Sequence, residues 1–228
     1  MSPDHSEWPG FFVSKKVLSR YIYMMPVKYK IPEENVDDIT LLDSGAAYSY
    51  ADYLRWTFED RVELIKGKIF HMSPAPNRSH QKVSASLGNK MYNFLEGHPC
   101  EVYFAPFDVR LPSKKGSEDK EIFNVVQPDI VVVCDQSKLD DKGCIGAPDL
   151  VVEILSPFTA AKDLKNKYSL YEESGVREYW IVYPGEEIIE IFALGDSGKF
   201  ELRNRFVGED EIQSAVLVGF SLKAREVF

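Results

Sequence analysis

Two acidic residues inside apolar, strand-like runs are the strongest chemical signal in the sequence. Asp129 follows Pro128 at the start of the run PDIVVV, and Glu153 lies within the next such run, PDLVVEIL. A carboxylate in an apolar strand loses a large solvation free energy unless a cation or hydrogen bonds compensate for it. A divalent cation held between two such groups replaces their repulsion with a shared attraction. A turn Asp and a solvent-facing Glu remain the structural alternative.

Magnesium suits a site of this kind, because it accepts one or two carboxylates and keeps several waters, one of which can act as a nucleophile. Phosphodiester hydrolysis is the chemistry that such a site favours. Lys167, in the segment after the Glu153 run, is the candidate cation that would orient the water or offset developing charge. From its spacing alone, an i,i+4 surface pair with Asp163, worth about 0.2–0.5 kcal/mol, is the simpler interpretation.

Four further polar residues could approach the same cleft, and each has a competing interpretation as a solvent-facing side chain. Two of them open an expected helix, where the helix dipole favours a phosphate. The other two lie in strand-like runs and could add a carboxylate. The four are His80, Gln81, Glu63 and Asp108. Tyr179 and Trp180 are assigned to the core rather than to a base-stacking platform.

The elements that must position these residues alternate between strands and helices. The runs RVEL and KIFHM flank Lys66 and Gly67 and predict a hairpin. A helix is expected to start at Ser79 as its N-cap, and a second one covers residues 160–174. Three strand-like runs lie between these helices, EVYFAPFDVRL, FNVVQPDIVVV and PDLVVEIL, followed by REYWIVYP and an alternating tail. This order predicts an α/β fold: a mixed central sheet flanked by helices, with an added N-terminal hairpin and C-terminal strands.

Length and composition limit the class of protein. The 228 residues suit one domain over 46–228, preceded by an extension or arm over 1–45 that lacks sustained periodicity. A formal charge of −9 disfavours nucleic-acid coating by bulk electrostatics and leaves only local basic patches. The 3 cysteines form no CxxC pair, which argues against a disulfide framework and a zinc ribbon and favours a reducing, cytoplasmic location. No apolar run approaches the ~18 residues of a membrane span.

Several segments together resemble a known family in order and spacing. They are SPAPNRSHQ, APFDVRL, QPDIVVV, APDLVVEILSP, Asp163 with Lys167, and GVREYWIVYP. They are similar to the Uma family of restriction-endonuclease-like proteins, which belongs to the PD-(D/E)XK nuclease superfamily. The resemblance runs from about residue 48 to the C-terminus. It implies a restriction-endonuclease-like core, a Mg²⁺ site in which Mn²⁺ can substitute, and hydrolysis of DNA.

The resemblance also assigns roles to individual residues. Asp129 matches the first superfamily motif and Glu153 the acidic position of the second, so these two are the expected metal ligands. The lysine expected two residues after the second acid is Leu155 here. The resemblance implies that this role has moved to the following helix. The expected catalytic set is Asp129, Glu153 and Lys167, with Gln81 and Glu63 in support.

The missing motif lysine leaves the function open between an active nuclease and other classes. The first alternative is a catalytically inactive nuclease-fold module that binds DNA or a protein partner. A weaker one is a metal-dependent hydrolase of a small phosphorylated molecule. A homodimer is expected only by analogy with nucleases that cut both strands. No helix-turn-helix, zinc-finger or RNA-binding signature indicates a target sequence.

Overall fold

The computed structural model describes residues 35–72, 76–156 and 160–228, with only the backbone for 160–163. All of them lie in one compact unit, Pro32–Phe228. Residues 1–34, which make up most of the predicted N-terminal extension, lie outside the described residues. The predicted division at residue 45 therefore stays a prediction.

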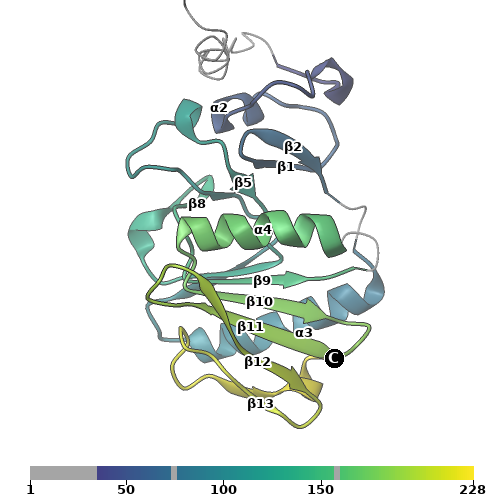
Figure 1. Ribbon diagram of the computed structural model, residues 1–228, viewed down its shortest axis with the longest axis vertical. Coiled ribbons are helices and arrows are strands. Elements are labelled where there is room, and N and C mark those ends of the chain that lie inside the picture. Colours follow the sequence, from purple (N-terminus) through teal and green to yellow (C-terminus); the bar gives the residue numbers. More distant parts are fainter. Residues whose placement is uncertain (1–34, 73–75, 157–159) are drawn as a thin grey trace, which may run out of the picture. The chain divides into compact units, whose positions relative to one another are not determined.

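A six-stranded sheet forms the centre of this unit (Figure 1). Its order is β12-β11-β10-β9-β6-β3; only β9 and β10 are parallel neighbours, and the other pairs are antiparallel. This confirms the predicted mixed central sheet. The strands are β3 (Glu101–Phe104), β6 (Ile130–Val133), β9 (Leu150–Ile154), β10 (Glu178–Tyr183), β11 (Ile188–Leu194) and β12 (Phe200–Val207).

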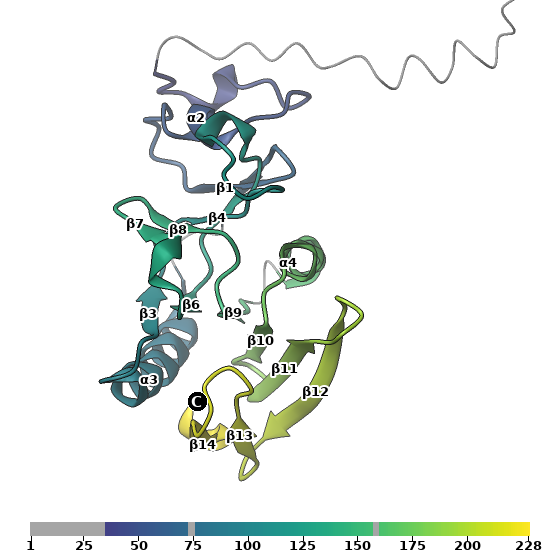
Figure 2. The same ribbon diagram turned by 90° about the vertical axis from the view of Figure 1, so that its left-hand side faces the viewer.

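Two long helices cover opposite faces of this sheet: α3 (Arg78–Leu95) and α4 (Ala160–Ser174) (Figure 2). Successive side chains of a strand point to opposite faces. Val132 and Val152 accordingly pack in the cluster on the α3 side, whereas Val131 and Val151 pack in the cluster on the α4 side. The middle strands are therefore buried on both faces, as their nearly continuous apolar sequences predicted.

The chain also forms a second six-stranded sheet, of order β2-β1-β5-β4-β8-β7. Its strands alternate along the sequence with those of the central sheet. Its strands are β1 (Val62–Ile65), β2 (Lys68–His71), β4 (Val109–Arg110), β5 (Val125–Val126), β7 (Leu139–Asp140) and β8 (Gly143–Ile145). The predicted hairpin is confirmed as β1 and β2, and its turn residues Lys66 and Gly67 have φ of 52° and 75°. The hairpin belongs to this sheet and is not a separate addition. The polar segment DQSKLDDKG, which separates two of the strand-like runs, contributes β7 and the start of β8.

Two strand-like runs that the sequence presents as continuous are divided between the two sheets. EVYFAPFDVRL forms β3 and β4, and FNVVQPDIVVV forms β5 and β6. Each run changes sheet at a proline, Pro106 or Pro128, because a residue without an N–H cannot continue the hydrogen-bonded ladder. The prediction of two single strands was therefore wrong. The crossing at Gln127–Asp129 places polar residues where the two sheets meet.

Smaller elements complete the unit. The short helix α2 (Tyr50–Tyr53) precedes the hairpin, and β13 (Glu211–Gln213) pairs with β14 (Ser221–Lys223) after the central sheet. The 3-10 turns are η2 (Ile39–Leu41), η3 (Asp119–Glu121), η4 (Gln136–Lys138) and η5 (Ala224–Glu226). None of the described helices is long and apolar enough to cross a membrane.

A disulfide joins Cys100 to Cys134, contrary to the expectation of unpaired cysteines. Cys100 precedes β3 and Cys134 follows β6, and these strands pair with Glu101 opposite Val133. The antiparallel register therefore brings the two cysteines together, although 34 positions separate them in the sequence. Cys144 is buried and free. The expected reducing, cytoplasmic location loses the support that it took from the cysteines.

Candidate active site

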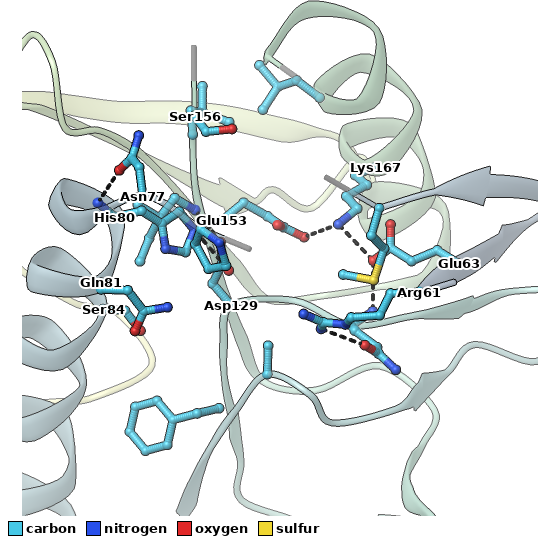
Figure 3. A pocket seen from close by; sticks show the side chains of 18 of the residues that line it. Arg61, Glu63, Asn77, His80, Gln81, Ser84, Asp129, Glu153, Ser156 and Lys167 are labelled. Atoms are coloured by element: carbon cyan, nitrogen blue, oxygen red, sulfur yellow. Dashed lines mark hydrogen bonds and ion pairs between the residues drawn. The ribbon is translucent and has the colours of Figure 1, made fainter. Parts of the chain in front are cut away.

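Asp129 immediately precedes β6, and Glu153 lies in β9, the neighbouring strand of the central sheet. β6 and β9 pair with Ile130 opposite Val152, and this register, continued by one residue, sets Asp129 opposite Glu153. Directly opposed residues share a face of the sheet, with Cβ atoms about 4.5–5.5 Å apart. The two side chains are 20% and 11% exposed, and both line a cavity of about 1050 Å³ (Figure 3). Glu153 is therefore not the solvent-facing residue of the structural alternative, and Asp129, although it lies in a bend, directs its side chain to the same cavity.

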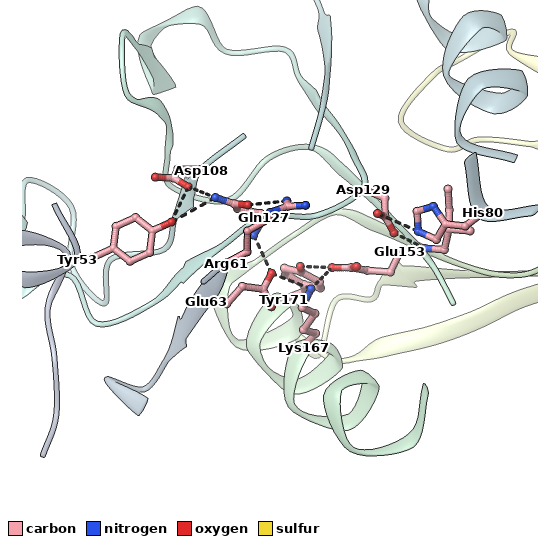
Figure 4. A network of polar contacts seen from close by, with 11 residues as sticks. Tyr53, Arg61, Glu63, His80, Asp108, Gln127, Asp129, Glu153, Lys167 and Tyr171 are labelled. Carbon is pink, nitrogen blue, oxygen red and sulfur yellow. Dashed lines mark hydrogen bonds and ion pairs between the residues drawn. The ribbon is translucent and has the colours of Figure 1, made fainter. Parts of the chain in front are cut away.

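Lys167 points from α4 toward these acids (Figure 4). Its Nζ lies 3.0 Å from Glu153 Oε1 and 2.9 Å from Glu63 Oε1. One turn further along the helix, the hydroxyl of Tyr171 donates to the same Glu153 oxygen at 2.6 Å. The side chain of Asp163 lies outside the described residues. The Lys167 ammonium is therefore part of the cluster, 12% exposed, and not a solvated surface charge.

Burial and charge shift the pKa values of this cluster in a consistent way. Burial raises the pKa of Glu153 to about 7, with Lys167 opposing the shift and Asp129 adding to it. For Lys167, burial lowers the pKa, but the charges of Glu153 and Glu63 outweigh it and leave the pKa raised. The Lys167 side chain is thus a permanent positive charge at neutral pH and is unsuited to act as a general base.

The N-terminus of α3 supplies a second partner for Asp129. Asn77 caps the helix by accepting the backbone N–H of His80, so the N-cap is Asn77 and not the predicted Ser79. This start directs His80 Nε2 to within 3.1 Å of Asp129 Oδ1. Burial lowers the pKa of His80, but the hydrogen bond and the charge of Asp129 outweigh it, and the net shift is upward.

The other predicted residues divide between the cavity and its surroundings. Gln81 follows His80 and lines the cavity, and Glu63 of β1 lines it from the second sheet. Asp108 does not line it: its carboxylate accepts hydrogen bonds from Gln127 at 2.8 Å and from Tyr53 at 3.4 Å. Burial raises the pKa of Asp108. Asp108 is accordingly neither a ligand in the cavity nor a surface charge.

Gln127 is one of the residues at this site, together with Tyr171 and Arg61, that the sequence did not reveal. Its backbone N–H donates to Glu63 Oε1 at 2.8 Å, and its side-chain oxygen accepts from Arg61 at 3.0 Å. A chain of contacts therefore runs from Asp108 through Gln127 and Glu63 to Lys167 (Figure 4). A glutamine before Pro-Asp carries no sequence signal of its own. Only the meeting of the two sheets gives it this place.

Comparisons with known proteins identify the family. Residues 50–225 match Uma2, a family described as "Putative restriction endonuclease". The chain belongs to this family. An uncharacterized Synechocystis sp. protein is 28% identical to it over 156 residues, which cover 67% of this chain and 77% of that protein. A crystal structure titled as a putative nuclease belonging to DUF820, from Anabaena variabilis, superposes with a TM-score of 0.62 at 17% identity, covering 79% of this chain and 97% of that one. At this identity the likeness concerns the fold, which is the predicted restriction-endonuclease-like core.

The cluster offers a divalent cation suitable partners in number and charge. Three carboxylates, Asp129, Glu153 and Glu63, face one ammonium, which leaves two negative charges when all three are ionised and His80 is neutral. Within the part of the chain that the structure describes, both hydrogen bonds of Glu153 use Oε1, which leaves Oε2 available. Among the same residues, no group of three or more His, Cys, Asp or Glu side chains could hold a metal by itself. Asp129 and Glu153 therefore suit an ion that binds two carboxylates and completes its coordination shell with water, as Mg²⁺ usually does.

A leucine occupies the position, two residues after Glu153, at which the resemblance to the PD-(D/E)XK superfamily predicts a lysine. Leu155 stands two residues after Glu153 and lines the cavity without supplying a charge. Lys167 brings an ammonium to the same acid from α4 instead. An ammonium therefore lies beside Glu153, and it comes from α4, the helix that follows β9 in the chain.

Proposed function

We propose that this protein is a Mg²⁺-dependent endonuclease that hydrolyses phosphodiester bonds in DNA, with Mn²⁺ able to replace Mg²⁺. The observation that carries the proposal is the meeting of Asp129, Glu153 and Lys167 at one cavity in a chain of the restriction-endonuclease family. Asp129 and Glu153 would hold the ion, which would neutralise phosphate charge and lower the pKa of a bound water.

The chain's own groups would prepare the reaction. His80 and the backbone N–H of Ile154 each hold one oxygen of Asp129, at 3.1 and 2.7 Å, which fixes the plane of that carboxylate. Lys167, positioned by Glu63 and Glu153, would offset the negative charge that develops on the phosphate oxygens. Gln81, which lines the cavity, would donate a hydrogen bond to the substrate.

The test is cleavage and metal uptake measured on matched variants. We expect Mg²⁺ or Mn²⁺ to permit cleavage of at least one member of a panel of supercoiled, linear, single-stranded and branched DNA. Asp129→Asn and Glu153→Gln should each abolish cleavage and reduce Mn²⁺ uptake in calorimetry, because each removes a charged ligand. Glu173→Gln, an exposed acid of α4 outside the cavity, is the control and should change neither. Cleavage that survives in both site variants would overturn the assignment.

A binding module without catalysis is the second candidate. It is favoured by Leu155 at the motif position and by the engagement of Lys167 in two ion pairs, which a substrate must compete with. This candidate predicts DNA binding that is insensitive to divalent ions and no product with any ion tested. A homodimer and a cytoplasmic location stay predictions from the sequence.

A further inference from the structure

Two exposed aromatic side chains line the cavity that holds the acids. Tyr92 of α3 is 64% exposed and Phe104 at the end of β3 is 41% exposed. Aromatic rings usually contribute to the core, since each can bury about 150–250 Å². Tyr179 and Trp180 do so here and are fully buried, as the sequence predicted. Tyr92 and Phe104 instead present ring surface beside the candidate active site.

The position of Phe104 depends on a glycine. A Cβ atom built on Gly88 of α3 would lie 2.1 Å from Phe104 Cε1, so the ring rests directly on the helix backbone. Glycine within a helix costs about 1 kcal/mol relative to alanine. At this position it makes the space that the ring occupies. Tyr92 follows Gly88 by four residues, and residues four apart are neighbours on a helix surface. Tyr92 therefore lies one helical turn from the place where the Phe104 ring rests, and both rings line the cavity.

Apart from His80 and Ala85, the other residues of α3 that line the cavity are polar and uncharged. Gln81, Ser84 and Asn89 line it, and they offer hydrogen-bond groups of the kind that contact base edges. On the side of the second sheet, Arg61 is exposed, and one of its N–H groups is used by Gln127. A guanidinium has five such donors and pairs well with phosphate.

The charge of the chain disfavours a ligand held mainly by its backbone. Duplex binding without base stacking relies on many Lys and Arg contacts to phosphate, whereas the formal charge is −9. Stacking of bases on aromatic rings needs no such excess and tolerates any sequence. It requires bases that are free of their pairing partners.

We propose that the cavity binds an unpaired stretch of DNA, with bases stacked on Tyr92 and Phe104 and the phosphate backbone directed toward Arg61 and the acids. This inference rests on the proposed nuclease function and specifies its substrate. The shared chemistry is an unpaired base, which a free single strand or a base extruded from a duplex can supply.

Fluorescence anisotropy tests the proposal with three labelled DNA probes of one sequence: a single strand, its perfect duplex, and a duplex with a central mismatch. Binding is measured in Ca²⁺, so that it does not depend on turnover. The single strand should bind more tightly than the perfect duplex. Tyr92→Ala and Phe104→Ala should each weaken its binding about 5- to 140-fold, the range for one stacked base. Tyr92→Phe keeps the ring and should stay within about twofold of wild type.

Phe123→Ala is the matched control, because Phe123 is 38% exposed but does not line the cavity. Tight binding of the mismatched duplex would identify an extruded base as the source, and binding of the single strand alone would identify a free strand. Unchanged affinity in both alanine variants, or a preference for the perfect duplex, would overturn the inference. Metal-dependent cleavage lost in Asp129→Asn would then leave the nuclease function standing. Conversely, ring-dependent binding without cleavage would refute the nuclease function alone.

Discussion

Replacing Lys167 with methionine tests the electrostatics of the acid cluster most directly. The substitution keeps most of the side-chain volume and removes the ammonium that pairs with Glu63 and Glu153. The three side chains are between 7% and 12% exposed, so the carboxylates lose their counter-charge in a poorly hydrated environment. Breaking a buried pair in this way destabilises a protein by about 3–5 kcal/mol.

The protonation of Glu153 sets an independent limit on how much of this loss of stability depends on pH. In the unfolded chain Glu153 has a pKa of about 4.5, and holding it protonated costs about 1.36 kcal/mol per pH unit above that value. The folded wild type already carries this cost up to its own pKa of about 7, so the additional loss through Glu153 is limited to about 1.4 kcal/mol at pH 8 and to about zero at pH 5. In the folded wild type its pKa is raised to about 7, so its stabilising contribution is complete below about pH 4.5 and is lost as the pH rises through 7. Removing Lys167 raises this pKa further, so the deficit of the variant should be largest at pH 8.

Urea unfolding followed by tryptophan fluorescence measures the effect. We expect Lys167→Met to be less stable than wild type at pH 8, with a deficit about 1.4 kcal/mol larger than at pH 5, because Glu153 of the wild type titrates between these two pH values. Lys165→Met changes an exposed lysine of the same helix and should alter stability by less than about 0.5 kcal/mol. A deficit below about 1 kcal/mol at pH 8, or an equal deficit at both pH values, would refute the reasoning.

Three further predictions concern separate parts of the molecule. Gly88→Ala should displace the Phe104 ring and weaken single-strand binding in the anisotropy assay, while the unfolding free energy changes by less than about 1 kcal/mol; unchanged binding would contradict this. Reducing the Cys100–Cys134 disulfide, or replacing Cys100 with serine, should cost about 3–4 kcal/mol in urea unfolding, because the bond closes a loop of 34 residues; equal stability with and without reductant would count against it. Glu178→Leu should cost at least about 3 kcal/mol, since it leaves an indole N–H and two backbone amides without an acceptor; the milder Glu178→Gln is its control in the same assay.

The sequence predicted the parts of the fold that depend on local pattern. The hairpin at Lys66 and Gly67, the helix over 160–174 and the buried strands around Val131 and Val151 all follow from short-range periodicity and turn chemistry. The acid pair could be anticipated because a carboxylate in an apolar strand is costly wherever that strand lies.

The remaining features depend on contacts between distant segments. The change of sheet at Pro128, the place of Gln127 and the pairing of Cys100 with Cys134 all require knowledge of which strands become neighbours. Likewise, the four-residue spacing from Asp163 suggested a surface pair for Lys167. Only the packing of α4 on the sheet directs this ammonium to the acids.

The crossing at Gln127 has a consequence for how the activity would be lost on heating. Asp129 and Glu153 lie at the central sheet, whereas Glu63 belongs to the hairpin and reaches Lys167 only while the two sheets adjoin. The ion pairs of Lys167 thus connect the hairpin sheet to the central sheet, and on heating the two sheets can separate before the central sheet unfolds. If the hairpin separates first, the proposed nuclease activity would be lost while most of the circular dichroism of the central sheet persists. Loss of activity would then be detected at a lower temperature than loss of secondary structure.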